Sequence, residues 1–152
     1  MSTLPSDYEG NSLPPDEGGE DPLHQEDENE VWDLDILRSR HDARARAVQV
    51  LYAIEIGEQG LGEALDDLVR GGEQKYIEFA RKLVQLAHSR RDELDRTIEE
   101  KARHWKLNRI AVLDRLILRM AMSELLYVKD VPPKVTINEA IEIGKHFSTD
   151  QS

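Results

Sequence analysis

The sequence predicts an all-α protein, a bundle of helices preceded by a separate acidic segment. From residue 39 onward, apolar residues recur at steps of three and four, which is the spacing of an amphipathic helix. Strand patterns are nearly absent from the same stretch. A glycine pair at 71–72 and a proline pair at 132–133 divide it into segments of helical length. A chain of 152 residues is long enough for one domain with its own core.

Charge divides the chain into two parts. Residues 1–37 hold 12 Asp and Glu and no Lys or Arg, whereas residues 38–152 hold 20 basic and 19 acidic residues. The first part is also rich in proline and cannot bury enough apolar surface to offset chain entropy. We therefore expect a disordered acidic N-terminal extension over 1–37 and a helical domain over 38–152. The apolar residues of "VWDLDIL" at 31–37 are the part of the extension that could dock.

Two functions are open for the extension. Like-charge runs usually keep a protein in solution, and a solubilising role is the simpler interpretation. Alternatively, the acidic residues mimic a nucleic-acid backbone and compete for a basic face of the helical domain.

The first helix is expected to begin at Ser39. The pattern Ser39-x-x-Asp42 fits a capping box, in which the serine oxygen accepts from free amides at the helix start. Five apolar residues at helical spacing form its expected core face: Ala43, Ala47, Val50, Leu51 and Ile54. A short helix is expected over about 62–70, before the glycine pair.

A long amphipathic helix is expected from Ile77 to Trp105, with a bend or junction at "HSRRDE" (88–93). A further helix is expected over 108–128, ahead of the proline pair, which cannot continue it. The core face of this helix is expected to hold Ile110, Leu113, Ile117, Ala121, Leu125 and Val128.

The last helix is expected over about 137–147. Thr136-x-x-Glu139 is a second capping box at its start. Its core face is expected to hold Ile137, Ala140, Ile141 and Gly144.

The sequence contains no specific pattern of catalytic or metal-binding residues. There is no cysteine, and the five histidines show no metal-ligand spacing. No phosphate-binding glycine loop follows a strand, and adjacent carboxylates are typical of solvated helix faces. We expect no catalytic residue, no metal and no cofactor. Without a run of signal or membrane-span length, the chain is expected to be cytoplasmic and not bound to a membrane.

The start of the first helix favours a binding function. On a helical wheel, Arg44, Val48 and Tyr52 line one stripe, expected to lie apart from the Val50 and Ile54 face. Guanidinium groups bind phosphate, and aromatic rings stack on bases. Arg40 and Arg44 in a first helical turn oppose the helix dipole, which a bound anion would explain. The alternative is a solvated helix whose Tyr52 packs into a groove of its own protein.

Three blocks resemble the NusB family of transcription antitermination factors: "RARAVQVLYAIEIGE" (44–58), "WKLNRIAVLDRLILRMAMSELLY" (105–127) and "VPPKVTINEAIEIGKHFS" (131–148). The resemblance spans about residues 40–152, and the last two blocks are the more specific. It implies two three-helix halves packed crosswise. It also implies that the protein binds boxA RNA of ribosomal RNA leader transcripts together with NusE, a small-subunit ribosomal protein, and helps to load the RNA polymerase antitermination complex.

The resemblance also implies roles for individual residues. Arg40 and Arg44 match the arginine-rich start of the family's first helix, which contacts RNA. His41 and Asp42 stand where the family often has further arginines. Tyr52 and Asp114 match positions that family members offer to NusE.

Two features depart from the family pattern. The acidic extension is not typical of it, and the sequence stops before the usual final helix that follows "FS". Either the sequence is a fragment of a longer chain, or the expected bundle lacks its C-terminal helix, in which case an apolar groove left exposed would favour a homodimer.

Two other functions fit the same resemblance. NusB-like domains also position RNA in some ribosomal RNA cytosine methyltransferases, whose catalytic domain lies elsewhere. A third interpretation is a NusB-like fold that serves only as a protein dimerisation scaffold.

Overall fold

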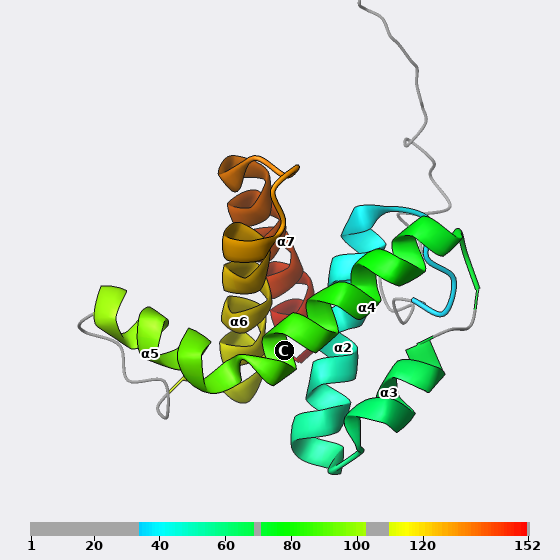
Figure 1. Ribbon diagram of the computed structural model, residues 1–152, viewed down its shortest axis with the longest axis horizontal. Coiled ribbons are helices and arrows are strands. Elements are labelled where there is room, and N and C mark those ends of the chain that lie inside the picture. Colours follow the sequence, from blue (N-terminus) through cyan, green and yellow to red (C-terminus); the bar gives the residue numbers. More distant parts are fainter. Residues whose placement is uncertain (1–33, 69–70, 103–109, 152) are drawn as a thin grey trace, which may run out of the picture. The chain divides into compact units, whose positions relative to one another are not determined.

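The computed structural model describes residues 34–68, 71–102 and 110–151, with side chains described as far as Phe147. This part of the chain forms six helices and no strand (Figure 1). They are α2 (Arg40–Gly57), α3 (Leu61–Leu68), α4 (Gln74–Ser89), α5 (Arg91–Lys101), α6 (Val112–Tyr127) and α7 (Pro133–Gln151). The predicted all-α class is confirmed. Residues 1–33 of the expected disordered extension and the expected helical residue Trp105 lie outside the described residues.

Helices α2, α3 and α4 pack on one another, and α6 packs on both α5 and α7. The two groups of three meet where α6 contacts α2 and α4 (Figure 1). None of the described helices is long and apolar enough to cross a membrane.

Helix α2 lies at the centre of this arrangement. It begins as predicted, since the Ser39 side chain accepts a hydrogen bond from the Asp42 amide at 3.1 Å. The Asp42 carboxylate in turn accepts from the Arg38 amide. Because α2 contacts α3, α4 and α6, it is buried on several faces, beyond the single face that periodicity predicts. Its buried residues are Ala43, Arg44, Ala45, Ala47, Val48, Val50 and Leu51.

The expected long helix from Ile77 to Trp105 is two helices. Helix α4 ends at Ser89, Arg90 leaves the helical conformation, and α5 begins at Arg91. The break lies within the predicted junction at 88–93. Apolar residues at helical spacing continue through it, with Ala87 and Leu94 both buried, which is why periodicity alone does not reveal the break.

The expected core faces of α6 and α7 are partly wrong. Leu125 of α6 is 38% exposed, and Ile137 and Ile141 of α7 are each 50% exposed. Helix α7 begins at Pro133, where a proline suits the first turn, and it runs to Gln151. Thr136 is therefore buried inside the helix instead of capping it, and Ile143 is the fully buried isoleucine.

The packed part of the chain begins before Arg38. Leu34 and Leu37 are buried whereas Ile36 is 43% exposed, so within "VWDLDIL" the two leucines are packed and the isoleucine is not. Leu37 forms a parallel bridge with Gly72, in which the Leu37 amide donates to Gly71 and the Glu73 amide donates to Leu37. Gly72 has φ +101°, and a Cβ there would overlap the Leu37 backbone. A glycine is therefore required at 72.

We expect Gly72→Ala to lower the free energy of unfolding by roughly 1–3 kcal/mol, because alanine there is both strained and in collision with Leu37. Chemical denaturation would measure the change. Gly62→Ala is the matched control, since a Cβ on this α3 glycine meets nothing within 4 Å. Equal stability of the two variants would contradict the interpretation.

Candidate RNA-binding and partner-binding surfaces

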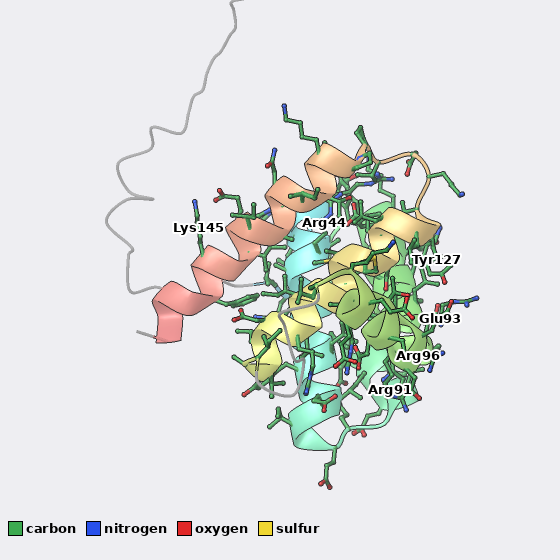
Figure 2. All side chains as sticks on the ribbon, turned by 90° about the vertical axis from the view of Figure 1, so that its left-hand side faces the viewer. Arg44, Arg91, Glu93, Arg96, Tyr127 and Lys145 are labelled. Atoms are coloured by element: carbon green, nitrogen blue, oxygen red, sulfur yellow. The ribbon has the colours of Figure 1, made fainter. Side chains whose placement is uncertain are left out.

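A buried ion pair joins the start of α2 to α6 and α7. Arg44 donates from Nε and Nη2 to the two carboxylate oxygens of Glu124, at 2.8 and 2.5 Å. The side chains of Arg44 and Glu124 are 4% and 0% exposed. Glu139 of α7 lies 3.4 Å from Arg44 Nη1 and 2.6 Å from His41 Nδ1. Figure 2 shows Arg44 where the ribbons of α2 and α7 cross.

Arg44 therefore does not lie on the exposed stripe that the helical wheel predicts. Val48, on the same expected stripe, is fully buried as well. The prediction fails because α6 and α7 cover this side of α2, and Glu124 provides a buried partner for the guanidinium. The Arg44 side chain joins α2 to α6 and α7, and in this arrangement it is not accessible to a phosphate.

Arg40 lies one turn earlier and is accessible. Its side chain is 41% exposed, and its guanidinium lies 4.4 Å from the centre of the Phe79 ring on α4. Arg40 Nη2 is 3.0 Å from Oδ2 of Asp130, a carboxylate that is 67% exposed. The hydrogen bond from Arg40 lowers the pKa of Asp130. Arg40 is thus an exposed cation positioned by an aromatic ring, with a solvated carboxylate as its partner.

A second surface lies at the other end of α2. Tyr52 is 42% exposed and Ile56, one turn further along, is 51% exposed. Asp114 on α6 is exposed too. An ion pair between Glu55 and Arg115, at 3.4 Å, joins the two helices beside these side chains. Tyr52 and Asp114 are thus both exposed, on two helices that this ion pair joins.

Charged groups also join α6 to its neighbours. Arg119 makes two hydrogen bonds of 2.7 Å to Asp95 of α5, and these raise the pKa of Arg119 against the effect of burial. On α4, burial lowers the pKa of His88, and the positive charges of Arg91 and Arg119 lower it further. The Arg119–Asp95 pair thus joins α6 to α5. Among the residues with described coordinates, no group of three or more His, Asp or Glu could hold a metal ion.

Comparison with known proteins identifies the family. The family model described as "NusB family" matches residues 41–152. The transcription antitermination protein NusB of Myxococcus xanthus is 39% identical over 122 residues, which cover 76% of this chain and 87% of the relative. The chain belongs to the NusB family.

Solved NusB structures share the fold. T. maritima NusB matches with a TM-score of 0.65 and 32% identity, over 73% of this chain and 80% of that one. The solution structure of NusB from Aquifex aeolicus matches with a TM-score of 0.61 and 27% identity, over 76% and 80%. A chain in a structure described as "Crystal Structure of a Plectonemic RNA Supercoil" matches with a TM-score of 0.67 and 26% identity, over 76% and 86%. These matches confirm the NusB-like bundle.

Three residues that contact Arg40 and Arg44 at the start of α2 were not predicted from the sequence. Phe79 and Asp130 contact Arg40, and Glu124 neutralises Arg44. Asp130 and Glu124 are separated from their arginines by 90 and 80 positions. Glu124 is a carboxylate on the otherwise apolar face of "LILRMAMSELLYV". This is the one signal in the sequence that could have indicated that Glu124 is buried against a basic partner.

We expect Glu124→Ala to lower the free energy of unfolding by up to about 3–5 kcal/mol, because the buried Arg44 charge would lose its fully buried partner and keep only the longer contact with Glu139. The double substitution Arg44→Met with Glu124→Leu should recover most of the loss, since it removes both charges. Chemical denaturation would measure both. As control, Asp130→Ala removes an exposed partner of Arg40 and should change stability little. A small effect of Glu124→Ala would contradict a structural role for the pair.

Proposed function

We propose that this chain is a non-catalytic transcription antitermination factor that acts in the cytoplasm. It binds boxA-type single-stranded RNA of ribosomal RNA leader transcripts, together with NusE, as part of the RNA polymerase antitermination complex. The observation that carries the proposal is the exposed Arg40, held over Phe79 at the start of α2, in a chain of the NusB family.

The relatives support the antitermination role. The M. xanthus protein bears that name, as does a Pelotomaculum thermopropionicum protein that is 40% identical over 75% of this chain and 81% of its own length. Both relatives are named as antitermination proteins, which favours the antitermination factor over the RNA-positioning domain of a methyltransferase. The likeness to a chain in an RNA supercoil structure is consistent with binding to RNA.

Arg40 can exchange its protein partner for a phosphate. An ion pair between exposed side chains contributes little stability in water, typically below about 1 kcal/mol. A guanidinium pairs with a phosphate through two parallel hydrogen bonds, as it does with a carboxylate. Asp130 therefore occupies Arg40 in the absence of RNA and leaves when a phosphate arrives.

The surface of Tyr52, Ile56 and Asp114 supports the protein partner. Exposed aromatic and aliphatic groups beside a carboxylate and an ion pair have the mixed character of a protein interface, in which an aromatic anchor is central. We propose that this surface binds NusE. Helical rise places Tyr52 about 18 Å from Arg40 along α2, so RNA and NusE can bind at the same time.

Arg40→Ala should weaken binding of a boxA-like single strand and reduce the slope of log affinity against log salt by about 0.7, the value for one phosphate contact on a single strand. Fluorescence anisotropy at several salt concentrations would measure both. Binding that is absent, or independent of salt, would contradict RNA recognition by this chain.

Two variants serve as controls for this titration. Lys145→Ala removes a positive charge from α7, on the side opposite Tyr127 in Figure 2, and should leave the slope unchanged. Asp130→Asn removes the carboxylate that competes for Arg40, and should tighten binding only while Arg40 is present.

Tyr52→Ala and Asp114→Ala should each weaken binding of NusE, by removing an anchor and a charge from the proposed interface. Calorimetric titration of NusE into each variant would measure the loss. The affinity for RNA alone should not change, whereas the strengthening of RNA binding by NusE should disappear. Unchanged NusE affinity in both variants would place the interface elsewhere.

A further inference from the structure

Three basic residues lie along one side of α4 and at its C-terminal cap, and the exposed Glu78 lies at the edge of this side. Lys75, Lys82 and Arg90 follow one another with Phe79 and Leu86 between them, at steps of three and four. This spacing aligns the four residues within α4 along one side of the helix, and Arg90 follows the last turn as its C-cap. Lys75, Lys82 and Arg90 are exposed, and we refer to these three residues as the α4 stripe.

The Arg40 guanidinium lies beside the α4 stripe. Phe79 lies under the Arg40 guanidinium at 4.4 Å, and Lys82 is close enough to Asp130 to help lower the pKa of that carboxyl. At the end of α4, the Arg90 guanidinium lies 4.7 Å from the centre of the Tyr127 ring. A helical rise of 1.5 Å per residue puts Arg90 about 16 Å beyond Phe79.

The carboxylates beside the stripe are exposed, like Asp130. Glu93 lies 3.3 Å from Arg90, with side chains 52% and 47% exposed, and Glu73 lies 3.6 Å from Lys75, with side chains 64% and 68% exposed. Exposed pairs of this kind hold their partners weakly and are screened by salt. A chain of phosphates can therefore replace them, as it can replace Asp130.

We propose that the α4 stripe is a second RNA-binding surface, along which the RNA continues from Arg40 to Arg90 and Tyr127. Lys82 and Arg90 contact successive phosphates, and the half-buried ring of Tyr127 offers a stacking edge to a base. Basic groups interleaved with aromatic rings are typical of surfaces for single-stranded nucleic acid. The proposal rests on the proposed RNA-binding function and extends it to residues on a different helix.

An acidic protein segment is the other polyanion that such a stripe could attract. The observations favour RNA, because Arg40 lies over Phe79, between Lys75 and Lys82 in the sequence of α4, and Arg90 lies over the aromatic ring of Tyr127. An acidic peptide would use the charges alone and would gain nothing from Tyr127.

The test compares RNA of two lengths against a double substitution. The double substitution Lys82→Ala with Arg90→Ala should weaken binding of a boxA-like RNA of about 16 nucleotides several-fold. A strand of about 5 nucleotides should bind to this variant with the same affinity as to the unchanged protein. The salt slope for the longer RNA should fall by about 1.4, the value for two phosphate contacts on a single strand. Tyr127→Leu should weaken binding of the longer RNA without changing its salt slope.

The control removes two positive charges from elsewhere, by Lys101→Ala with Lys145→Ala. Lys101 is the last residue of α5, whose far end lies away from α2 in Figure 1, and Lys145 lies opposite Tyr127 in Figure 2. This variant should bind both RNAs as the unchanged protein does. Thermal unfolding would verify that every variant folds.

The possible failures are distinguishable. If Arg40→Ala weakens RNA binding but the Lys82 and Arg90 substitutions do not, the stripe is not a path for RNA and the proposed function stands. If neither changes RNA binding, the proposed function itself fails. If the stripe substitutions reduce binding of poly-glutamate but not of RNA, the surface recognises an acidic protein and the inference is overturned.

Discussion

The pairing of Arg44 with Glu124 is the interaction on which the arrangement of the helices depends. One guanidinium at the start of α2 meets a fully buried carboxylate of α6 and approaches a second carboxylate on α7. Two opposite charges buried together are tolerable only because their hydrogen bonds satisfy each other, and either one alone would be costly. The pair thus requires that α2, α6 and α7 meet in one register. The first turn of α2, which carries Arg40, takes its position from that register.

Arg40 and Arg44, at the start of α2, differ in burial and therefore in role. Arg40 and Arg44 are one turn apart and both lie near Phe79, at 4.4 and 5.3 Å from its ring centre. The deeper of the two is enclosed by carboxylates of other helices, and the outer one is solvated with an exposed partner. The family pattern matches both arginines to RNA contact. In our proposal, only the exposed Arg40 contacts RNA.

Helix α2 also separates the two proposed surfaces. Its start, together with one face of α4, presents positive charge beside aromatic rings, and its end presents Tyr52 and Ile56 near Asp114. Between these ends the helix is buried against three others. RNA and a protein partner can therefore be bound by opposite ends of one rigid element, with no overlap between them.

The sequence by itself determined the helical class, the family, the cap at Ser39 and most apolar positions of α2, because these follow from local spacing and from matched motifs. It also located the junction between α4 and α5 to within a few residues, although the apolar rhythm continues through it. The exposed sides of α6 and α7 were not predictable, since Ile137 and Ile141 have the spacing of a core face and only the neighbouring helices decide which face is covered. For the same reason, only the tertiary structure decides that Arg44 is buried and Arg40 is exposed. Glu124 and Asp130 are 80 and 90 positions away from the residues they pair with, and no local pattern encodes such a contact.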